Sequence, residues 1–234
     1  MKPALKKGYI VAIDGPAGAG KSTVSRQLAE ALRGRLFDTG SMYRSVGYYA
    51  IKAGTKDEKK IGVIAAKLKF KSDESEESFT VNGEALGARL RTERVSQMAS
   101  FVSQFKLVRE VLTKQQRTLA KDWAKKIPVV VEGRDIGTVV FPDVEFKFFV
   151  TASAEVRADR RYQQLKKNQM RGVKYDEILK QIQDRDRRDS NRKLAPLKCA
   201  EDAVVVDTSH MGIHQVVLFM RDHIVQHLKL VRGK

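Results

Sequence analysis

The fold of this chain follows from one short segment, Gly15-Pro16-Ala17-Gly18-Ala19-Gly20-Lys21-Ser22. Its spacing matches G-x-x-x-x-G-K-[ST]; an apolar, β-branched run at residues 9–13 precedes it, and apolar residues at helical spacing follow it over 22–32. Glycines let successive backbone N–H groups turn toward one point, and the positive end of the following helix adds to their attraction for an anion. The segment therefore predicts a phosphate-binding loop between a buried strand and a helix.

Two side chains of this loop have defined roles in such a site. Lys21 supplies a point charge for the β- and γ-phosphates of a nucleoside triphosphate, and Ser22 supplies a hydroxyl where Mg²⁺ bridges them. The motif leaves three classes open: a GTPase switch, an ATPase motor and a small-molecule kinase. No Asn-Lys-x-Asp guanine signature occurs in the chain. Thr55-Lys56-Asp57, its nearest approach, lies in a polar stretch rather than after a strand.

The amino-acid composition limits the classes of protein and of binding partner to consider. The chain has 234 residues, with 45 Lys and Arg against 28 Asp and Glu, and so a net charge of +17. A single cysteine, Cys199, excludes an internal disulfide framework and is typical of a reducing cytoplasm. No apolar run approaches the roughly 18 residues of a spanning helix, and the run after the basic start is too short for a signal peptide. The charge favours polyanionic partners: nucleic acid, an anionic membrane surface or small phosphorylated substrates.

Strand and helix patterns alternate along the rest of the chain, which predicts an α/β fold with a five-stranded parallel sheet and helices on both faces. After the first strand, we expect strands at residues 36–38, 128–132, 144–150 and 203–207. We expect helices at about 42–52, over most of 95–125, and at 154–167, 175–188 and 213–230. Asn82-Gly83, between alternating residues, predicts a tight turn in a small antiparallel insertion over 66–92, whose acidic residues at 73–77 form a solvated hairpin tip.

Three polar clusters at 38–44, 132–138 and 185–192 are candidates to line the crevice where parallel strands end. In the third cluster, Arg185, Asp189 and Arg192 fall at i, i+4 and i+7, on one face if the helix continues. Forked guanidinium groups match phosphate oxygens and keep their proton, so such arginines suit a second anion brought against a γ-phosphate. The alternative is a solvated helix with ion pairs such as Arg185 to Asp189.

Four groups of motifs beyond the phosphate loop occur in order along the chain. They are Asp38-Thr39-Gly40-x-x-Tyr43-Arg44; Leu90-Arg91-Thr92 with Val108-Arg109-Glu110 and Gln116-Arg117; Gly133-Arg134-Asp135-x-Gly137-Thr138-Val139-Val140-Phe141-Pro142; and Arg185-Asp186-x-x-Asp189-x-x-Arg192 with Ala195-Pro196-Leu197. Together they closely resemble the bacterial cytidylate kinase family over nearly the whole chain. The resemblance implies a P-loop NTPase fold with a core (1–65, 93–156 and 189–234), a monophosphate-binding insertion (66–92) and a helical lid (157–188).

The same resemblance implies the activity and the partners. The family transfers the γ-phosphoryl group of ATP, with Mg²⁺, to CMP or dCMP in pyrimidine nucleotide metabolism. It implies a cytoplasmic monomer whose partners are these small molecules, with no required nucleic acid and no membrane.

The resemblance also implies roles for individual residues. Arg44 and Arg134 hold the α-phosphate of the acceptor, while Arg185 and Asp189 hold its ribose hydroxyl. For the cytosine edge the implied readers are Ser100, Arg109 and Asp135. The catalytic residues are Lys21, Arg134 and Arg185. ATP is bound by Asp14, Gly15, Pro16, Ala17, Gly18, Ala19, Gly20, Lys21, Ser22 and Thr23, with Arg157 and Arg161 from the lid. The remaining acceptor residues are Thr39, Tyr43 and Arg192.

Several alternatives stay open beside this interpretation. A nucleic-acid-binding protein would also use the positive charge, although aromatic residues make up 7% of the chain and show no stacking pattern among the basic runs. A kinase for another small acceptor, such as UMP, is a nearer alternative. The histidine pairs 210/214 and 223/227 have zinc-chelating spacing but no evident third ligand. The carboxylate that completes the Mg²⁺ site is Asp14, Asp38 or Asp135, acting through water.

Overall fold

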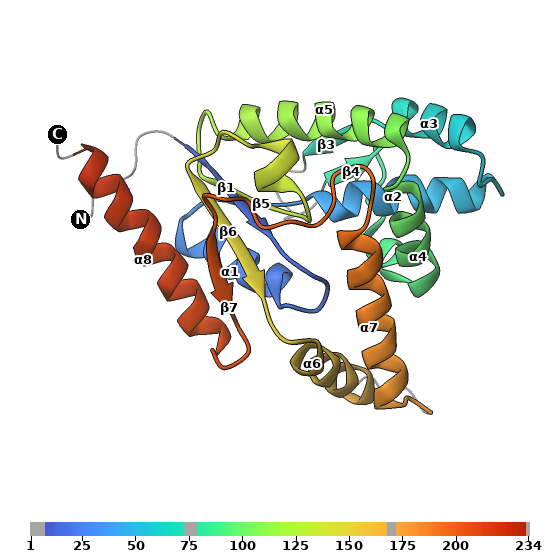
Figure 1. Cartoon of the computed structure of the whole chain (residues 1–234). Coiled ribbons are helices and arrows are strands. Elements are labelled where there is room, and N and C mark those ends of the chain that lie inside the picture. The colour runs from blue at the N-terminus through green and yellow to red at the C-terminus, as the bar shows by residue number, and fades with distance from the viewer. Residues whose placement is uncertain (1–7, 73–78, 168–171, 233–234) are drawn as a thin grey trace.

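The computed structural model describes residues 8–72, 79–167 and 172–232 (Figure 1). Its main sheet has five strands in the order β2-β5-β1-β6-β7, and every neighbouring pair is parallel. The strands are β1 (Ile10–Asp14), β2 (Arg35–Asp38), β5 (Val129–Glu132), β6 (Phe146–Thr151) and β7 (Val204–Asp207). The predicted α/β fold with a five-stranded parallel sheet is confirmed.

Helices cover both faces of this sheet (Figure 1). On one face, α1 (Lys21–Ala31) and α8 (Ile213–Arg232) enclose an apolar core. On the other, the core is closed by α2 (Thr39–Lys52), α3 (Glu58–Lys67), α4 (Glu93–Val102) and α5 (Lys106–Trp123). The remaining elements are β3 (Phe70–Ser72), β4 (Phe79–Val81), the 3₁₀ turn η1 (Gly87–Arg91), the π-turn η2 (Ile136–Val140), α6 (Ala154–Lys167) and α7 (Tyr175–Ser190).

The position of the central strand β1 determines where the phosphate-binding loop and the other sequence motifs lie. Val11, Ala12 and Ile13 of β1 are at most 1% exposed, because sheet neighbours and helices cover the strand on every side. Parallel strands end at the same edge of a sheet, so the carboxyl ends of β1, β2 and β5 bring Asp14, Asp38 and Glu132 to one edge. The loops that follow these strands carry the motifs singled out in the sequence.

The helix expected from residue 42 begins at Thr39 instead. The cause is a cap: the Asp38 carboxylate accepts the Ser41 N–H at 3.2 Å, which satisfies a free donor in the first turn. Helix α3 was not predicted from the sequence. Its start is capped in the same way, since Asp57 accepts the Lys60 N–H at 2.8 Å.

The antiparallel insertion is present, and it is small. Strands β3 and β4 pair over three residues each, with Phe70 opposite Val81. The Asn82-Gly83 turn follows β4; its two residues have φ of 54° and 84°, and it pairs Val81 with Glu84. The expected acidic hairpin tip lies outside the described residues.

Helices α6 and α7 pack against each other through a separate apolar cluster around Ala158, Ile178 and Ile182. Helix α7 ends at Ser190, so Arg192 does not continue the helical face that Arg185 and Asp189 share. Arg192 instead follows the helix in the next turn. In the described parts of the chain, no helix is long and apolar enough to cross a membrane.

Candidate active site

The phosphate-binding loop leaves β1 and enters α1 as the sequence predicts. Gly15, Gly18 and Gly20 have φ of 144°, 80° and 84°, values that residues with a Cβ rarely adopt. A Cβ on Gly15 would lie 1.9 Å from the Val150 carbonyl oxygen of the neighbouring strand, so no other residue fits there. Gly20, in the left-handed region, is the residue before the first turn of α1. The loop and the helix N-terminus together form an anion-binding cradle.

Lys21 is folded into this loop. Its Nζ donates to the Pro16 carbonyl at 2.7 Å, and the residue is 4% exposed. Burial and the nearby Arg134 guanidinium lower the pKa of Lys21 to about 7, although Glu132 opposes them. A phosphate chain in the cradle would supply the anion that favours the charged amine.

Ser22 points to a carboxylate that the sequence analysis did not connect with it. The Ser22 hydroxyl donates to Glu132 Oε1 at 3.0 Å, while Glu132 Oε2 is buried with no hydrogen-bond partner among the described residues. Burial raises the pKa of Glu132, Asp38 raises it further, and Lys21 lowers it. A hydroxyl and a buried, under-bonded carboxylate beside a phosphate cradle fit a Mg²⁺ ion, which prefers oxygen ligands. Strand order is the reason the pair forms: β5 lies beside β1.

Each of the three aspartates proposed as the Mg²⁺ carboxylate already forms hydrogen bonds or an ion pair with groups of the protein. Asp14 accepts the N–H groups of Ile136 and Gly137, Asp135 pairs with Arg109, and Asp38 caps α2. Within residues 8–72, 79–167 and 172–232, no cluster of three His, Cys, Asp or Glu side chains could hold a metal ion.

Asp14 connects the two halves of the site. Its Oδ1 accepts the Ile136 N–H at 2.8 Å and its Oδ2 accepts the Gly137 N–H at 2.7 Å. The carboxyl group thereby fixes the turn after β5, which carries Arg134 and Asp135, to the strand that leads into the phosphate loop. Burial is the main cause that raises the pKa of Asp14 to about 6, and the two N–H groups oppose it.

Three arginines surround one acidic side chain at the end of α7. The Asp189 carboxylate lies 3.5 Å from Arg134 Nε and 3.9 Å from Arg185 Nε, and its backbone carbonyl accepts Arg192 Nε at 3.2 Å. Burial, and then Arg134, lower the pKa of Arg185 to about 10. Two buried donors, Arg185 Nε and Arg192 Nη2, have no hydrogen-bond partner in the described structure. The cluster therefore has more positive charge than its own carboxylate balances, as a phosphate site requires.

A second buried pair lies deeper in the same region. Arg109 forms an ion pair with Asp135, both about 8% exposed at the side chain, and donates to the Ser103 carbonyl at 3.2 Å. The Arg109 guanidinium lies 5.7 Å from the ring centre of Tyr43. Burial raises the pKa of the Tyr43 hydroxyl to about 12. The pair offers a fixed donor and a fixed acceptor beside an aromatic face, which suits the edge of a planar ring.

The arginines of α6 contact other protein groups in this structure, and Arg157, Arg160 and Arg161 all line the same cavity as the phosphate loop. Arg157 donates to the carbonyls of Ala152 and Ala17 at 2.9 and 3.1 Å and pairs with Asp186 at 2.6 Å, so it braces the phosphate loop against α7. Arg161 donates to Gln164 at 3.0 Å. Arg160, to which the sequence analysis gave no role, donates to the Thr208 carbonyl at 2.6 Å near the mouth of the loop.

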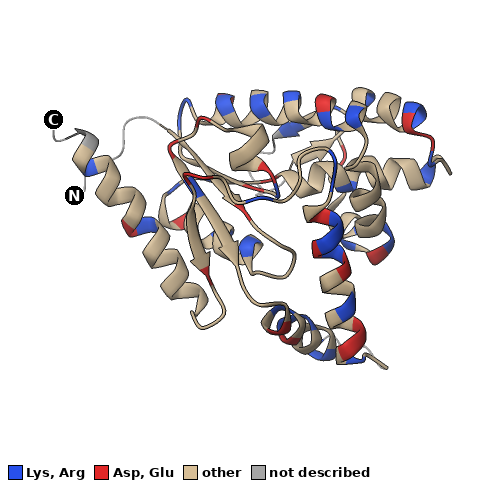
Figure 2. Cartoon of the chain, in the orientation of Figure 1, with Lys and Arg blue, Asp and Glu red and all other residues tan. Residues whose placement is uncertain are grey.

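One cavity of about 790 Å³ joins the phosphate loop, the arginine cluster around Asp189 and the Arg109–Asp135 pair. Every site residue predicted from the sequence lines it except Asp14, Gly15 and Pro16. Thr39 and Ser100 also line it, and the Thr39 hydroxyl is held by the Glu132 carbonyl at 2.7 Å. The lining has nine cationic side chains against four acidic ones. In Figure 2, basic segments recur on α6 and α7 beside the end of the sheet.

A parallel sheet, a phosphate loop at the end of its central strand and a facing arginine cluster define a phosphotransferase of the P-loop class. Comparison with known families gives the particular group: the cytidylate kinase family profile matches residues 11–229, and the chain belongs to that family. Cytidylate kinases from Caldanaerobacter subterraneus and Thermosipho melanesiensis are 46% and 44% identical, each over 88% of this chain and 90% and 92% of their own. The cytidylate kinase of Pasteurella multocida is 39% identical over 97% of this chain and 99% of its own.

Proposed function

We propose that this protein transfers the γ-phosphoryl group of ATP to CMP and dCMP, giving CDP and dCDP. Family membership supports the activity, and one observation carries it in the structure. The phosphate loop and the cluster of Arg134, Arg185 and Arg192 line the same cavity, so two phosphate groups can meet between them. Two anions approach each other only where cations compensate both.

The donor half binds the triphosphate. The loop N–H groups and Lys21 hold the β- and γ-phosphates. Ser22 and Glu132 would hold Mg²⁺, which would neutralise charge on the phosphate oxygens. Arg157 keeps the loop in place through its bond to Ala17. Arg161 reaches the nucleotide when α6 and α7 close over it, a movement that also excludes water.

The acceptor half positions the monophosphate. Arg44, with Asp38 3.5 Å away, and Arg134 hold the α-phosphate of CMP. Arg185 and Asp189 hold the ribose hydroxyl, and Arg192 reaches the phosphates. The attacking group is already a phosphate oxyanion, so the reaction needs no general base. Catalysis then consists of alignment and charge compensation.

The cytosine base is held apart from the phosphates. Ser100, Arg109 and Asp135 read its edge while Tyr43 packs beside the ring. Asp135 accepts from Arg109 and so keeps that guanidinium in one orientation. This fixed orientation gives the acceptor site its preference for cytosine.

We also propose the organisation that the resemblance implies: a core, a monophosphate-binding insertion and a lid formed by residues 157–188. The monomeric state that the resemblance implies is part of the same proposal. The exposed free thiol of Cys199 supports a reducing cytoplasm as its compartment.

Coupled measurement of ADP release with a panel of nucleoside monophosphates tests the proposed function. We expect CMP and dCMP to be the best acceptors by kcat/KM. Turnover of UMP above that of CMP would assign the site to another pyrimidine acceptor. No ADP release with any monophosphate would overturn the proposed activity.

Binding of ATP at about pH 8 should take up close to one proton. The free Lys21 amine, with its pKa lowered to about 7, is mostly neutral at that pH, and the bound triphosphate raises the pKa so that the amine becomes charged. Calorimetry in two buffers of different ionisation enthalpy measures this uptake. The Lys21→Met variant is the control and should lose it; equal uptake in the variant and the wild type would assign the proton to another group.

Substitution of Asp14 by asparagine should lower kcat about tenfold. The two carboxylate oxygens of Asp14 accept the N–H groups of Ile136 and Gly137, and the amide NH₂ of asparagine cannot accept either of them, so one N–H group would lose its acceptor. The charged carboxylate accepts both N–H groups, so activity of the wild type should fall as the pH drops through about 6, where Asp14 gains a proton. A pH–rate profile checks both statements. If the acidic limb persists unchanged in Asp14→Asn, Asp14 is not the group that titrates.

A further inference from the structure

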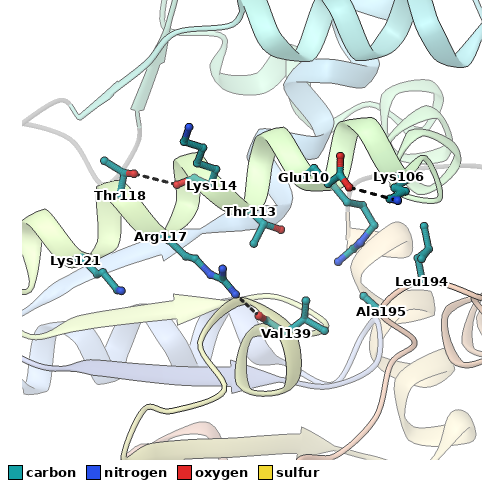
Figure 3. Close-up of a pocket in the computed structure, with 11 residues that line it drawn as sticks. Lys106, Glu110, Thr113, Lys114, Arg117, Thr118, Lys121, Val139, Leu194 and Ala195 are labelled. Carbon is teal, nitrogen blue, oxygen red and sulfur yellow. Dashed lines mark hydrogen bonds and ion pairs between the residues drawn. The ribbon is translucent and has the colours of Figure 1, made fainter.

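A second concave surface lies outside the cavity of about 790 Å³ described above, which we call the nucleotide cavity. It is an open groove of about 610 Å³ between α5, from Lys106 to Lys121, and an opposite wall formed by Val139, Leu194 and Ala195 (Figure 3). We call it the α5 groove. None of the roles proposed above uses its exposed lysines, and its lining shares a single residue, Arg109, with the nucleotide cavity.

The α5 groove carries a net positive charge. Lys106, Lys114, Arg117 and Lys121 line it together with Arg109, and Glu110 is its single acidic lining residue. Glu110 lies 3.8 Å from Lys106, and Asp135 balances Arg109. Within the described parts of the chain, Lys114 and Lys121 form no ion pair. The opposite wall is uncharged, so the field of these cations is not cancelled across the groove.

Arg117 has N–H donors that form no hydrogen bond within the described structure. Its Nε donates to the Val140 carbonyl and its Nη2 to the Val139 carbonyl, each at 2.8 Å. Figure 3 shows the bond to Val139, which holds the guanidinium across the groove. A guanidinium has five N–H donors, so three remain for a ligand. The side chain is already ordered, and less conformational entropy is lost when it binds an anion.

The shape of the groove favours a long ligand. Lys106 and Lys121 are fifteen positions apart on one helix, about 22 Å at the helical rise. A stacked strand of nucleic acid advances about 3.4 Å per phosphate, so several phosphates fit along this length. Figure 2 shows basic segments at successive turns along α5. The lining has no aromatic side chain, so base stacking contributes nothing and the sugar-phosphate backbone is the part recognised.

We infer that the α5 groove binds single-stranded nucleic acid through its phosphate backbone, without sequence preference. An anionic membrane is a poorer match, because the cations line a concave groove whose exposed apolar wall residue is Leu194 alone. This binding is separate from phosphoryl transfer and does not depend on the proposed function.

The test compares two variants with the same change of net charge. Lys114→Glu/Lys121→Glu alters the groove, and Lys52→Glu/Lys229→Glu alters two exposed lysines outside both cavities. Fluorescence anisotropy follows binding of a labelled oligouridylate of about 12 nucleotides across a salt series centred on about 150 mM. We expect the groove variant to lose at least about tenfold in affinity, and the control about twofold or less. Loss of two phosphate contacts should also reduce the salt slope by about 1.4.

Three outcomes would overturn the inference. Equal losses in the two variants would show that the strand follows overall charge rather than the groove. Displacement of the strand by saturating CMP would place it in the acceptor cavity instead. Binding to phosphatidylglycerol vesicles but not to the oligouridylate would assign the groove to a membrane surface. Kinase activity of both variants, expected to equal that of the wild type, verifies that they are folded.

Discussion

Lys21→Ala should reduce kcat of the kinase reaction by at least about a thousandfold. The amine is the one point charge built into the phosphate loop, and it compensates charge that builds up between the β- and γ-phosphates during transfer. Because Lys21 is 4% exposed, water does not replace the lost cation well. Single-turnover measurement of CDP formation at saturating ATP separates this chemical step from binding.

Lys21→Arg is the matched control, since it keeps the charge but not the point geometry. A planar guanidinium differs in shape from the ammonium group that donates to the Pro16 carbonyl at 2.7 Å, so we expect intermediate activity. Phosphoryl transfer at a near-normal rate in Lys21→Ala would contradict the mechanism.

Arg185→Ala should lower kcat/KM for both acceptors by about a hundredfold or more, with the larger loss for CMP. Arg185 lies in a partly exposed cationic cluster near Arg134 and Arg44, so its removal takes away charge that the acceptor phosphate needs. CMP has a 2′-hydroxyl and dCMP does not, so a bond from Arg185 to that hydroxyl contributes for CMP alone. The ratio of kcat/KM for the two acceptors in the variant and the wild type measures this difference.

Equal losses for CMP and dCMP would show that Arg185 acts on the phosphate and not on the sugar. A control at the edge of the same helix face is Arg188→Ala. Arg188 is exposed and donates to the Asp184 carbonyl at 3.3 Å, and it does not line the nucleotide cavity. That variant should keep the activity of the wild type within about twofold.

The parts of the fold that depend on local pattern were predictable. The runs at 9–13 and 128–132 are apolar and β-branched because neighbours cover both of their faces, and this pattern is visible in the sequence. The phosphate loop was predictable for a similar reason: its glycines serve a local backbone geometry that the φ values of Gly15, Gly18 and Gly20 now confirm.

The features that sequence reasoning missed depend on which strands become neighbours. Ser22 and Glu132 are 110 positions apart and meet because β5 inserts between β1 and β2. Asp14 reaches Ile136 and Gly137 for the same reason. Strand order is set by packing over the whole sheet, so spacing along the chain does not reveal either contact. One missed feature did have a local signal: Asp57 before Glu58 is a recognisable helix cap.

The most direct test concerns the claim that one cavity holds both phosphate groups at once. A bisubstrate analogue that joins adenosine and cytidine through a chain of five phosphates spans the phosphate loop and the arginine cluster. Calorimetry should show one molecule bound per chain, at least about a hundredfold more tightly than ATP, with the gain lost in both Lys21→Ala and Arg134→Ala. Binding no tighter than that of ATP, or a gain that survives Arg134→Ala, would show that the acceptor does not lie between loop and arginines.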